Sequence, residues 1–229
     1  MIGVFSSDYN NFEGLLKHVC LIKKYSYKEI KIAQVMIKNC QVLLVATGYN
    51  KINIGLALGY ILKCYNLKAI INIGNCGVID DSKYNIGDIC ISTSLIQYDL
   101  DSSTLGYAPG IIPGINIQYY SSNKKLVSKA IMVSQNLFHN THYGIFGTAE
   151  KFIPEDKNKL KNTFNIKFWD MEAANYAQVG YLYGIATISI KSISHYLDDT
   201  AANSYLHYHM LANNKAGDVA LGLIKELCC

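Results

Sequence analysis

Short, almost fully apolar runs alternate along this chain with longer amphipathic segments, and this alternation constrains the fold more than any other feature. Residues 40–47 (CQVLLVAT) and 68–73 (KAIINI) are near-continuous apolar runs, and a glycine follows each of them. Strands that are apolar on both faces are typical of parallel sheets buried between helices. The pattern therefore predicts an α/β fold in a single domain, residues 1–229, with a mostly parallel central sheet flanked by helices on both faces.

The period of the apolar residues gives the expected elements. Strands are predicted at residues 1–5, 40–47, 68–73, 88–97, 143–147 and 186–194, with a brief one ending at Phe168. Helices are predicted at residues 11–24, 52–65, 126–138, 156–164, 171–183 and 205–227. In open sheets of this kind, ligands bind beyond the carboxyl ends of the strands. The segments that follow the predicted strands are therefore the candidates for chemistry.

The composition excludes several function classes. Half of the 229 residues are hydrophobic, which is enough for a substantial core. The net charge of +4 is too mild to indicate a nucleic-acid partner or a membrane surface. All of the basic residues are lysines, so a site that clamps phosphate with guanidinium groups is not available to this chain.

Cysteine usage and the chain ends bear on location. The seven cysteines form no C-x-x-C pair, and several lie within apolar runs, as expected of reduced, buried thiols. Neither a signal peptide nor an apolar run of membrane-spanning length is recognisable. We therefore expect a cytoplasmic protein, in which the terminal pair Cys228 and Cys229 is a frayed tail.

Two segments after predicted strands carry candidate site residues. The turn 74–77 (GNCG) permits close approach of a ligand, but taken alone it is better explained as a purely structural tight turn. In the segment 168–174 (FWDMEAA), Asp170 fits a helix N-cap and Glu172 the first helical turn, where an acid favours the helix dipole. Glu172 could equally hold a vicinal diol, because one carboxylate accepts two hydroxyl donors. The spacing alone leaves both interpretations open.

Five motifs in a fixed order carry a resemblance to a known family. They are residues 71–78 (INIGNCGV), 85–91 (NIGDICI), 98–114 (YDLDSSTLGYAPGIIPG), 169–174 (WDMEAA) and 186–194 (ATISIKSIS), together with the G-x-x-K of residues 48–51. On these motifs the chain resembles the 5'-methylthioadenosine/S-adenosylhomocysteine nucleosidases of the purine nucleoside phosphorylase superfamily. The resemblance spans nearly the whole chain.

The resemblance implies a nucleoside phosphorylase-like fold and an adenine nucleoside as the small-molecule ligand. It also implies a homodimer with loop 98–114 at the interface. By this likeness Phe152 stacks on the purine, the Ile153 backbone contacts the purine edge, and Met171 and Glu172 hold the ribose. Tyr205 covers the ribose side, and Tyr107 and Pro113 line the 5'-substituent pocket of the partner subunit. Core packing is the alternative role for Phe152, Met171 and Tyr205.

The chain departs from the family pattern at four polar positions. An aspartate that protonates purine N7 is replaced by His195, and an arginine is replaced by Lys191. The glutamate that activates water is replaced by Asn11, and a serine by Asn75. His195 titrates near neutrality and, when protonated, could donate to N7; a hydrogen-bonded loop histidine is the alternative. Asp198 or Asp199 could supply the acid instead, and Glu13 could supply the base.

The resemblance implies hydrolysis of the N-glycosidic bond of 5'-methylthioadenosine/S-adenosylhomocysteine-type nucleosides in methionine salvage, releasing adenine and a thioribose. A diverged paralogue that binds adenine nucleosides without turnover is the alternative, and phosphorolysis is disfavoured because the chain has no arginine. No cofactor and no metal are expected. His207 and His209 form an H-x-H pair on a predicted helix, where side chains two residues apart point in different directions.

Overall fold

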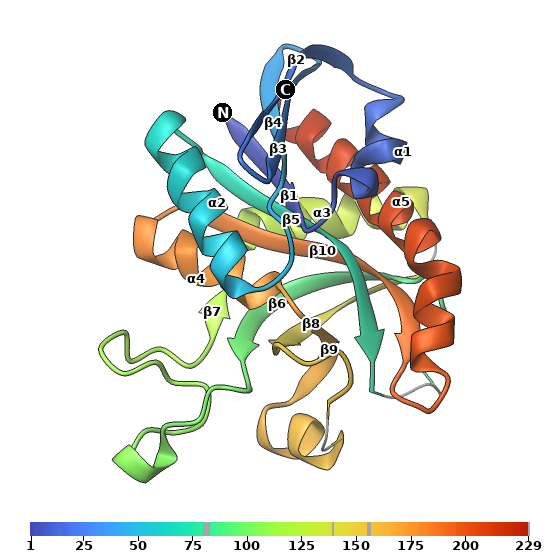
Figure 1. Ribbon diagram of the computed structural model, residues 1–229. Helices are drawn as coiled ribbons and strands as arrows, with labels where there is room; N and C mark the ends of the chain where they lie inside the picture. Colours follow the sequence, from blue (N-terminus) through green and yellow to red (C-terminus); the bar gives the residue numbers. More distant parts are fainter. Residues whose placement is uncertain (80–82, 139, 155–156, 229) are drawn as a thin grey trace.

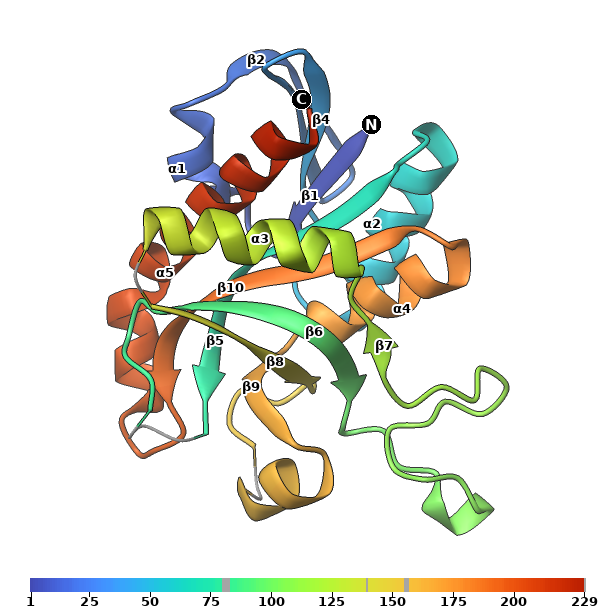
Figure 2. The ribbon, with the colours of Figure 1, turned by 180° about the vertical axis from the view of Figure 1, so that it is seen from behind.

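The computed structural model describes residues 1–79, 83–138, 140–154 and 157–228, and a large twisted sheet forms its centre (Figures 1 and 2). The strands are β1 (Ile2–Ser6), β2 (Cys20–Tyr27), β3 (Ile30–Ile37), β4 (Cys40–Ala46), β5 (Ala69–Val78), β6 (Ile89–Gln97), β7 (Tyr120–Ser121), β8 (Thr141–Thr148), β9 (Ile166–Asp170) and β10 (Ala186–Tyr196). Their order is β10-β6-β8-β9-β5-β1-β4-β3-β2, and β7 pairs with β6.

The predicted α/β fold with a central sheet is confirmed, and the sheet is mixed, with both parallel and antiparallel strand pairs. The pairs β1–β4, β1–β5, β10–β5, β6–β8 and β8–β9 are parallel. The pairs β2–β3, β3–β4, β5–β9, β10–β6 and β6–β7 are antiparallel. Two of these five antiparallel pairs lie near the N-terminus, where β2 and β3 extend the sheet beyond β4.

The predicted helix at residues 11–24 is replaced by a short helical segment and a strand. A 3-10 turn at Tyr9–Phe12 leads into α1 (Glu13–Leu16), and β2 begins at Cys20. Lys28 adopts a positive φ of 51°, which lets the chain turn back from β2 into β3. The apolar spacing of residues 12–22 also fits a helix, so the strand here is determined by its pairing with β3 rather than by local pattern.

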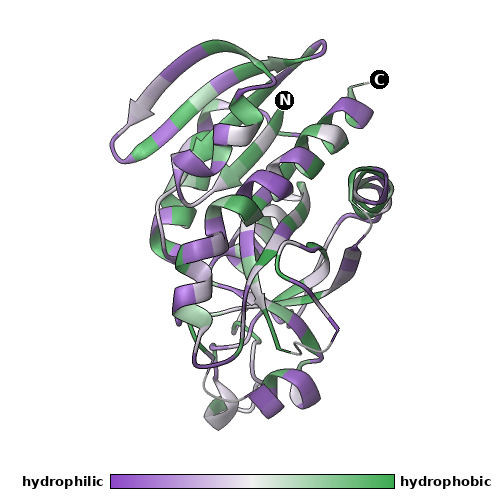
Figure 3. Ribbon diagram, turned by 90° about the vertical axis from the view of Figure 1, so that its right-hand side faces the viewer, coloured by the Kyte–Doolittle hydropathy of each residue, from purple (hydrophilic) through white to green (hydrophobic). Residues whose placement is uncertain are grey.

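Two groups of helices lie on opposite sides of the sheet. The helices after α1 are α2 (Lys51–Cys64), α3 (Lys124–Leu137), α4 (Ala173–Tyr183) and α5 (Ala201–Leu227), with a π-helical turn at Lys159–Thr163. The start of the helix predicted at residues 156–164 lies outside the described residues. Helices α3 and α5 pack together on one side, and α2 and α4 on the other (Figures 1 and 2). Along its length α5 carries both hydrophilic and hydrophobic residues (Figure 3).

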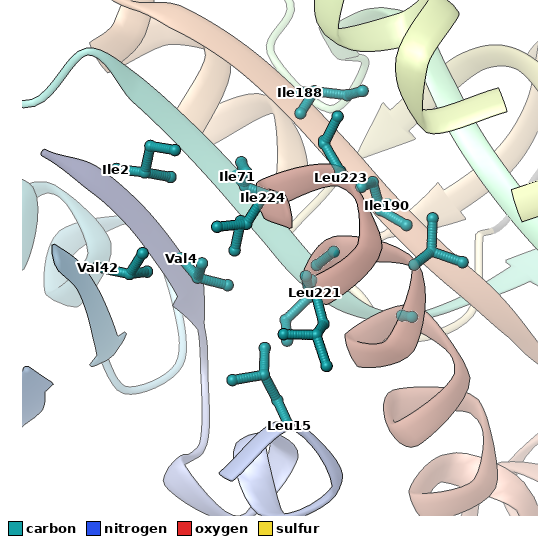
Figure 4. Close-up of a cluster of buried hydrophobic side chains, with 14 of the residues drawn as sticks. Ile2, Val4, Leu15, Val42, Ile71, Ile188, Ile190, Leu221, Leu223 and Ile224 are labelled. Atoms are coloured by element: carbon teal, nitrogen blue, oxygen red, sulfur yellow. The ribbon is translucent and has the colours of Figure 1, made fainter. Parts of the chain in front are cut away.

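Alternating residues of the central strands supply two separate cores. Val4 and Leu44 belong to the cluster that packs against α5, whereas their chain neighbours Phe5 and Val45 pack against α2. This alternation follows from the two-residue period of a strand. Figure 4 shows the first cluster, in which Leu221, Leu223 and Ile224 of α5 meet aliphatic side chains of β1, β5 and β10. Side chains of β1 and β4 are therefore buried on both faces.

The sheet closes on itself at β10. This strand pairs with β5 along ten register positions and with β6 through residues 190–192. Strands β5, β10, β6, β8 and β9 thus form a closed circuit of pairings. The register of the β10–β5 pair shifts between Ile193 and His195, so a bulge lies at the carboxyl end of β10. Bulges redirect side chains, and this one lies where β5, β9 and β10 end together.

Two cysteines form a disulfide, which corrects the expectation that all of them are reduced. Cys40, the first residue of β4, is bonded to Cys228 at the end of α5. Cys228 is therefore held rather than frayed, and Cys229 lies outside the described residues. Cys76 and Cys90 are buried free thiols, as the apolar runs predicted, whereas Cys20 and Cys64 are exposed.

No helix in the described part of the chain is long and apolar enough to cross a membrane. The loop 98–114 extends away from the rest of the molecule (Figure 1). It contains a 3-10 turn, Ser103–Leu105, in which Leu105 is 73% exposed.

Candidate active site

A pocket of about 640 Å³, open solvent at its mouth included, lies at the carboxyl ends of β1, β5, β9 and β10. Seven residues predicted from the sequence line it: Asn11, Asn75, Phe152, Met171, Glu172, His195 and Tyr205. The sequence separates these residues by up to 194 positions. The position agrees with the expectation that ligands bind beyond the strand ends.

A buried lysine and two carboxylates lie at the inner wall of this pocket. The Lys191 side chain on β10 is fully buried and forms ion pairs with Glu172 Oε1 and, at 3.3 Å, with Asp170 Oδ2. Asp170 also accepts hydrogen bonds from the Thr148 hydroxyl and from the backbone amides of Glu172 and Ala173. The Asp170 carboxylate therefore stabilises the start of α4, but α4 begins at Ala173, so Glu172 occupies the N-cap position that the sequence assigned to Asp170 and does not lie in the first helical turn.

Lys191 remains charged in this environment. Burial alone would lower the pKa of its ammonium group, but the adjacent charges of Glu172 and Asp170 outweigh burial, and the pKa is raised. One oxygen of Glu172, Oε1, receives both the Lys191 ammonium and, at 3.2 Å, the Asn72 side-chain amide. Oε2 is thus the oxygen through which Glu172 can accept hydrogen bonds from a ligand.

Four aromatic rings form the opposite wall. Phe152 stacks on His195 with ring centroids 5.0 Å apart, and Tyr205 meets Phe152 edge-on at 5.3 Å. Trp169 packs edge-on against His195, and its indole nitrogen donates to the Phe152 carbonyl at 3.0 Å. Trp169 was not among the predicted site residues, although it lies within the WDMEAA motif. Its hydrogen bond fixes the backbone beside the ring that the sequence assigns to purine stacking.

His195 is neutral, which corrects the expectation that it titrates near neutrality. Its side chain is buried among these aromatic rings, and burial lowers its pKa to about 4; nearby Asp198 opposes this shift only partly. Nδ1 lies 2.8 Å from the Ser194 hydroxyl, whereas the buried Nε2 has no hydrogen-bond partner. At neutral pH this imidazole carries a single proton.

A chain of side-chain hydrogen bonds connects three of the four positions at which the sequence departs from the family pattern, namely Asn11, Asn75 and His195. Asn11 accepts a hydrogen bond from Asn213 Nδ2 at 2.6 Å, and Asn213 Oδ1 accepts from Asn75 at 3.1 Å. Asn75 Oδ1 in turn accepts from the Ser194 hydroxyl, the partner of His195. Asn213 was missed by sequence analysis, because no local pattern links a residue of α5 to Asn11, 202 positions earlier.

The pocket mouth carries a tyrosine that was also missed, although the G-x-x-K motif contains it. Tyr49 lines the pocket and is 61% exposed. The next residue, Asn50, has φ 69° and ψ 161°, a region that side-chain-bearing residues rarely adopt, and its carboxamide caps the first amides of α2. Burial and the charges of Asp8 and Glu172 raise the pKa of Tyr49, and they raise that of Tyr205 as well.

Four predicted site residues do not line the pocket. Lys191 lies behind Glu172, and Ile153, which follows Phe152 in the chain, is 37% exposed. Tyr107 and Pro113 belong to the extended loop 98–114. Their predicted role is toward a second subunit, so their distance from this pocket does not test it.

The alternative acids and bases lie outside the pocket. Glu13 is exposed at the start of α1, and Asp199 is exposed in the turn after β10. Asp198 is engaged by the Thr200 amide and hydroxyl, both at 2.7 Å. Within the described ranges no cluster of His, Cys, Asp or Glu has the composition of a metal site.

Comparisons with known proteins identify the family of the chain and similar folds. The family model described as the phosphorylase superfamily matches residues 2–227. A 5'-methylthioadenosine/S-adenosylhomocysteine nucleosidase of Staphylococcus aureus (strain JH9) is 25% identical over 230 residues, 99% of this chain and 100% of the relative. The crystal structure of the Neisseria meningitidis nucleosidase of the same name, in complex with methylthio-immucillin-A, superposes with a TM-score of 0.92 at 20% identity, covering 98% of each chain. A Borrelia burgdorferi B31 protein, described as such a nucleosidase and bound to adenine, gives a TM-score of 0.90 at 26% identity, covering 99% of this chain and 100% of that one.

Proposed function

Because the chain belongs to the phosphorylase superfamily, we propose that its pocket binds 5'-methylthioadenosine/S-adenosylhomocysteine-type nucleosides and hydrolyses their N-glycosidic bond. The products are adenine and a thioribose. The observation that carries this proposal is the Glu172 carboxylate, oriented by Lys191 and Asn72 at the inner end of an aromatic pocket. A carboxylate held through one oxygen presents the other to ribose hydroxyls, which donate hydrogen bonds to it.

Each side chain of the site then has a definite task. Phe152 stacks on the purine, the Ile153 backbone contacts its edge, and Met171 and Tyr205 pack against the ribose beside Glu172. Lys191 keeps Glu172 in position, since its ammonium is charged and fully buried. Asn75 and Asn11 bind the polar side of the sugar.

Hydrolysis requires two proton movements that this site performs poorly. As the bond between C1' and N9 breaks, N7 must gain a proton, and the water that attacks C1' must lose one. His195 occupies the donor position with a pKa of about 4, and Asn11 can orient a water but cannot take its proton. We therefore expect slow turnover at neutral pH. The test is adenine release from methylthioadenosine by the purified protein, followed by chromatography over hours, with binding measured in parallel.

Replacing Glu172 tests the ribose contact. Glu172→Gln should weaken the binding of adenine nucleosides by about 1.5–3 kcal/mol, the size of a hydrogen bond to a charged group. Isothermal calorimetry with methylthioadenosine measures the change, and Glu29→Gln in the exposed β2–β3 turn is the matched control. Equal affinities for Glu172→Gln and the parent would leave Glu172 with only its structural pairing to Lys191.

A homodimer completes the proposal. Loop 98–114 carries Leu105, 73% exposed, and helix α2 presents Ile52 and Leu56, 69% and 67% exposed. A second copy that covers these side chains would also bring Tyr107 and Pro113 to the 5' end of the ligand.

Light scattering at micromolar concentration should give twice the chain mass of 25.5 kDa. Leu105→Lys should shift the protein toward the monomer, because it would place a charge in an apolar interface. Leu137→Lys, at the exposed end of α3, should leave the mass unchanged. A parent protein that scatters as a monomer contradicts the dimer.

The residues at the proton-donor and water-activating positions, His195 and Asn11, favour a second candidate function. A neutral His195 and an Asn11 carboxamide already bonded at both ends suit a protein that binds adenine nucleosides without turning them over. Calorimetric binding of methylthioadenosine without adenine release over a day would establish this alternative.

If the protein is a hydrolase, we propose that it lies in the cytoplasm and acts in methionine salvage.

A further inference from the structure

The pocket carries more negative than positive charge. Asp170 and Glu172 line it, and among its described lining residues there is no lysine or arginine. In the ion pairs of the described residues, one ammonium, that of Lys191, serves both carboxylates, so one positive charge stands against two negative charges. His195 adds no compensating charge at neutral pH, because its imidazole is uncharged.

A third carboxylate, that of Asp8, adds negative charge at the mouth of the pocket. Asp8 precedes the 3-10 turn that carries Asn11 and accepts a hydrogen bond from the Asn10 amide at 2.9 Å. Asp8 follows Ser7 in the chain, and Ser7 lines the pocket together with Tyr49 and Tyr205. In agreement with this position, burial and, after it, nearby charges that include those of Asp8 and Glu172 raise the pKa of both phenols. The nearby Lys51 ammonium instead faces Asp99, at 3.7 Å. The lysine at the start of α2 therefore does not offset the negative charge at the mouth of the pocket.

The rings at this end of the pocket suit a cation. Tyr49 and Tyr205 line the mouth, and Phe152 and Trp169 continue the aromatic wall inward. Aromatic faces attract cations, and they do so more strongly where carboxylates add to the field. A neutral thioether substituent would use the apolar surface of these rings but none of this charge.

We propose that the pocket selects adenine nucleosides that carry a positive charge on the ribose side, namely a sulfonium or ammonium group on C5', over their neutral thioether counterparts. The inference rests on the proposed function, because it takes the nucleoside pose from there. The cation would lie near Asp8 and between the tyrosines Tyr49 and Tyr205, while Glu172 holds the ribose hydroxyls.

A matched pair of ligands tests this preference. Methylthioadenosine and 5'-deoxy-5'-(dimethylsulfonio)adenosine differ by one methyl group and one positive charge. We expect calorimetry at low salt and pH 7 to give about tenfold tighter binding of the sulfonium. 5'-Amino-5'-deoxyadenosine, protonated at this pH, tests whether an ammonium is accepted as well. The advantage of the cation should shrink as sodium chloride is raised toward 1 M, because salt screens charges near the surface.

Two variants test whether the Asp8 carboxylate causes the preference for the cationic ligand. Asp8→Asn should narrow the affinity ratio between the sulfonium and the thioether about threefold or more, whereas Asp218→Asn, in the distal half of α5, should leave that ratio as it is. Equal affinities for the two ligands, or tighter binding of the thioether, would overturn the cation preference alone. If neither nucleoside binds, the proposed function fails, and the inference fails with it.

Discussion

Replacing His195 by aspartate should raise the rate of adenine release at neutral pH by about 10²–10⁴-fold, the usual contribution of a general acid. The reason is that burial acts in opposite directions on the two side chains. It removes the extra proton of a histidine and lowers the pKa of His195 to about 4, whereas it favours the protonated form of a carboxyl group. An aspartic acid in this pocket would therefore hold the proton that N7 needs.

The pH profile of the parent protein provides the first check. If protonated His195 is the donor, the parent rate should fall about tenfold per pH unit above 4, or about 10³-fold between pH 4 and pH 7. His195→Asn, which has the size of aspartate but no acidic proton, is the control and should not gain activity. A parent that is fast at pH 7, together with an unaffected His195→Ala, would show that another group supplies the proton.

The lack of a base for the attacking water limits this gain in the rate of adenine release. Asn11 still cannot accept a proton in the His195→Asp variant, so adding Asn11→Glu should increase the rate further and by more than an additive amount, because both groups act in one transition state. Asn213 would then donate to the new carboxylate, since its Nδ2 lies 2.6 Å from the Asn11 oxygen. If both restored variants bind adenosine but release no adenine, the binding function is favoured.

Replacing Lys191 by methionine should lower the free energy of unfolding by about 3–5 kcal/mol, the usual cost of removing one partner of a buried ion pair. Lys191 is fully buried, and its removal would leave the Asp170 and Glu172 carboxylates facing each other without a counter-charge. Urea titration monitored by circular dichroism measures the loss. The family pattern has an arginine here, so Lys191→Arg, which keeps the charge, should cost less than Lys191→Met.

The control for this prediction is Lys51→Met. Its ion pair with Asp99 spans 3.7 Å and the lysine side chain is 42% exposed, so its loss should change stability by less than about 1 kcal/mol. Equal losses for Lys191→Met and Lys51→Met would mean that the buried array contributes no more than a surface pair. That outcome would also weaken the role given to Lys191 in orienting Glu172.

The local sequence pattern was sufficient to predict the buried strands and most helices. It was insufficient where pairing with a neighbouring strand determines the secondary structure. The run 40–47 predicted β4 because both of its faces are buried, and such strands are apolar throughout. Strand β2 has no comparable signal, since it is largely exposed and packs on one neighbour only. Its apolar residues fitted a helical period equally well, and only β3 resolves the ambiguity.

The candidate site likewise contains features that the sequence could predict and features that it could not. Glu172 was predicted because it lies in the WDMEAA motif at a strand end, and Phe152 because the family resemblance implies it; both line the pocket. The neutral state of His195 could not be predicted, because it depends on Phe152, Trp169 and Tyr205, which reach it only in the folded chain. Asn213 is a similar case, since its contacts to Asn11 and Asn75 join α5 to two distant segments.

The closure of the sheet at β10 bears on how this protein behaves at high concentration. A strand with an unpaired edge can recruit a strand from another molecule, and closure removes that opportunity at the β10 end. Of the long strands that the structure describes, β2 is left as the open border. It is interrupted by an irregularity between Leu21 and Lys23, and the adjacent lysines Lys23 and Lys24 charge it. The irregularity and the lysine charges of β2 therefore act against strand-to-strand association at this open border.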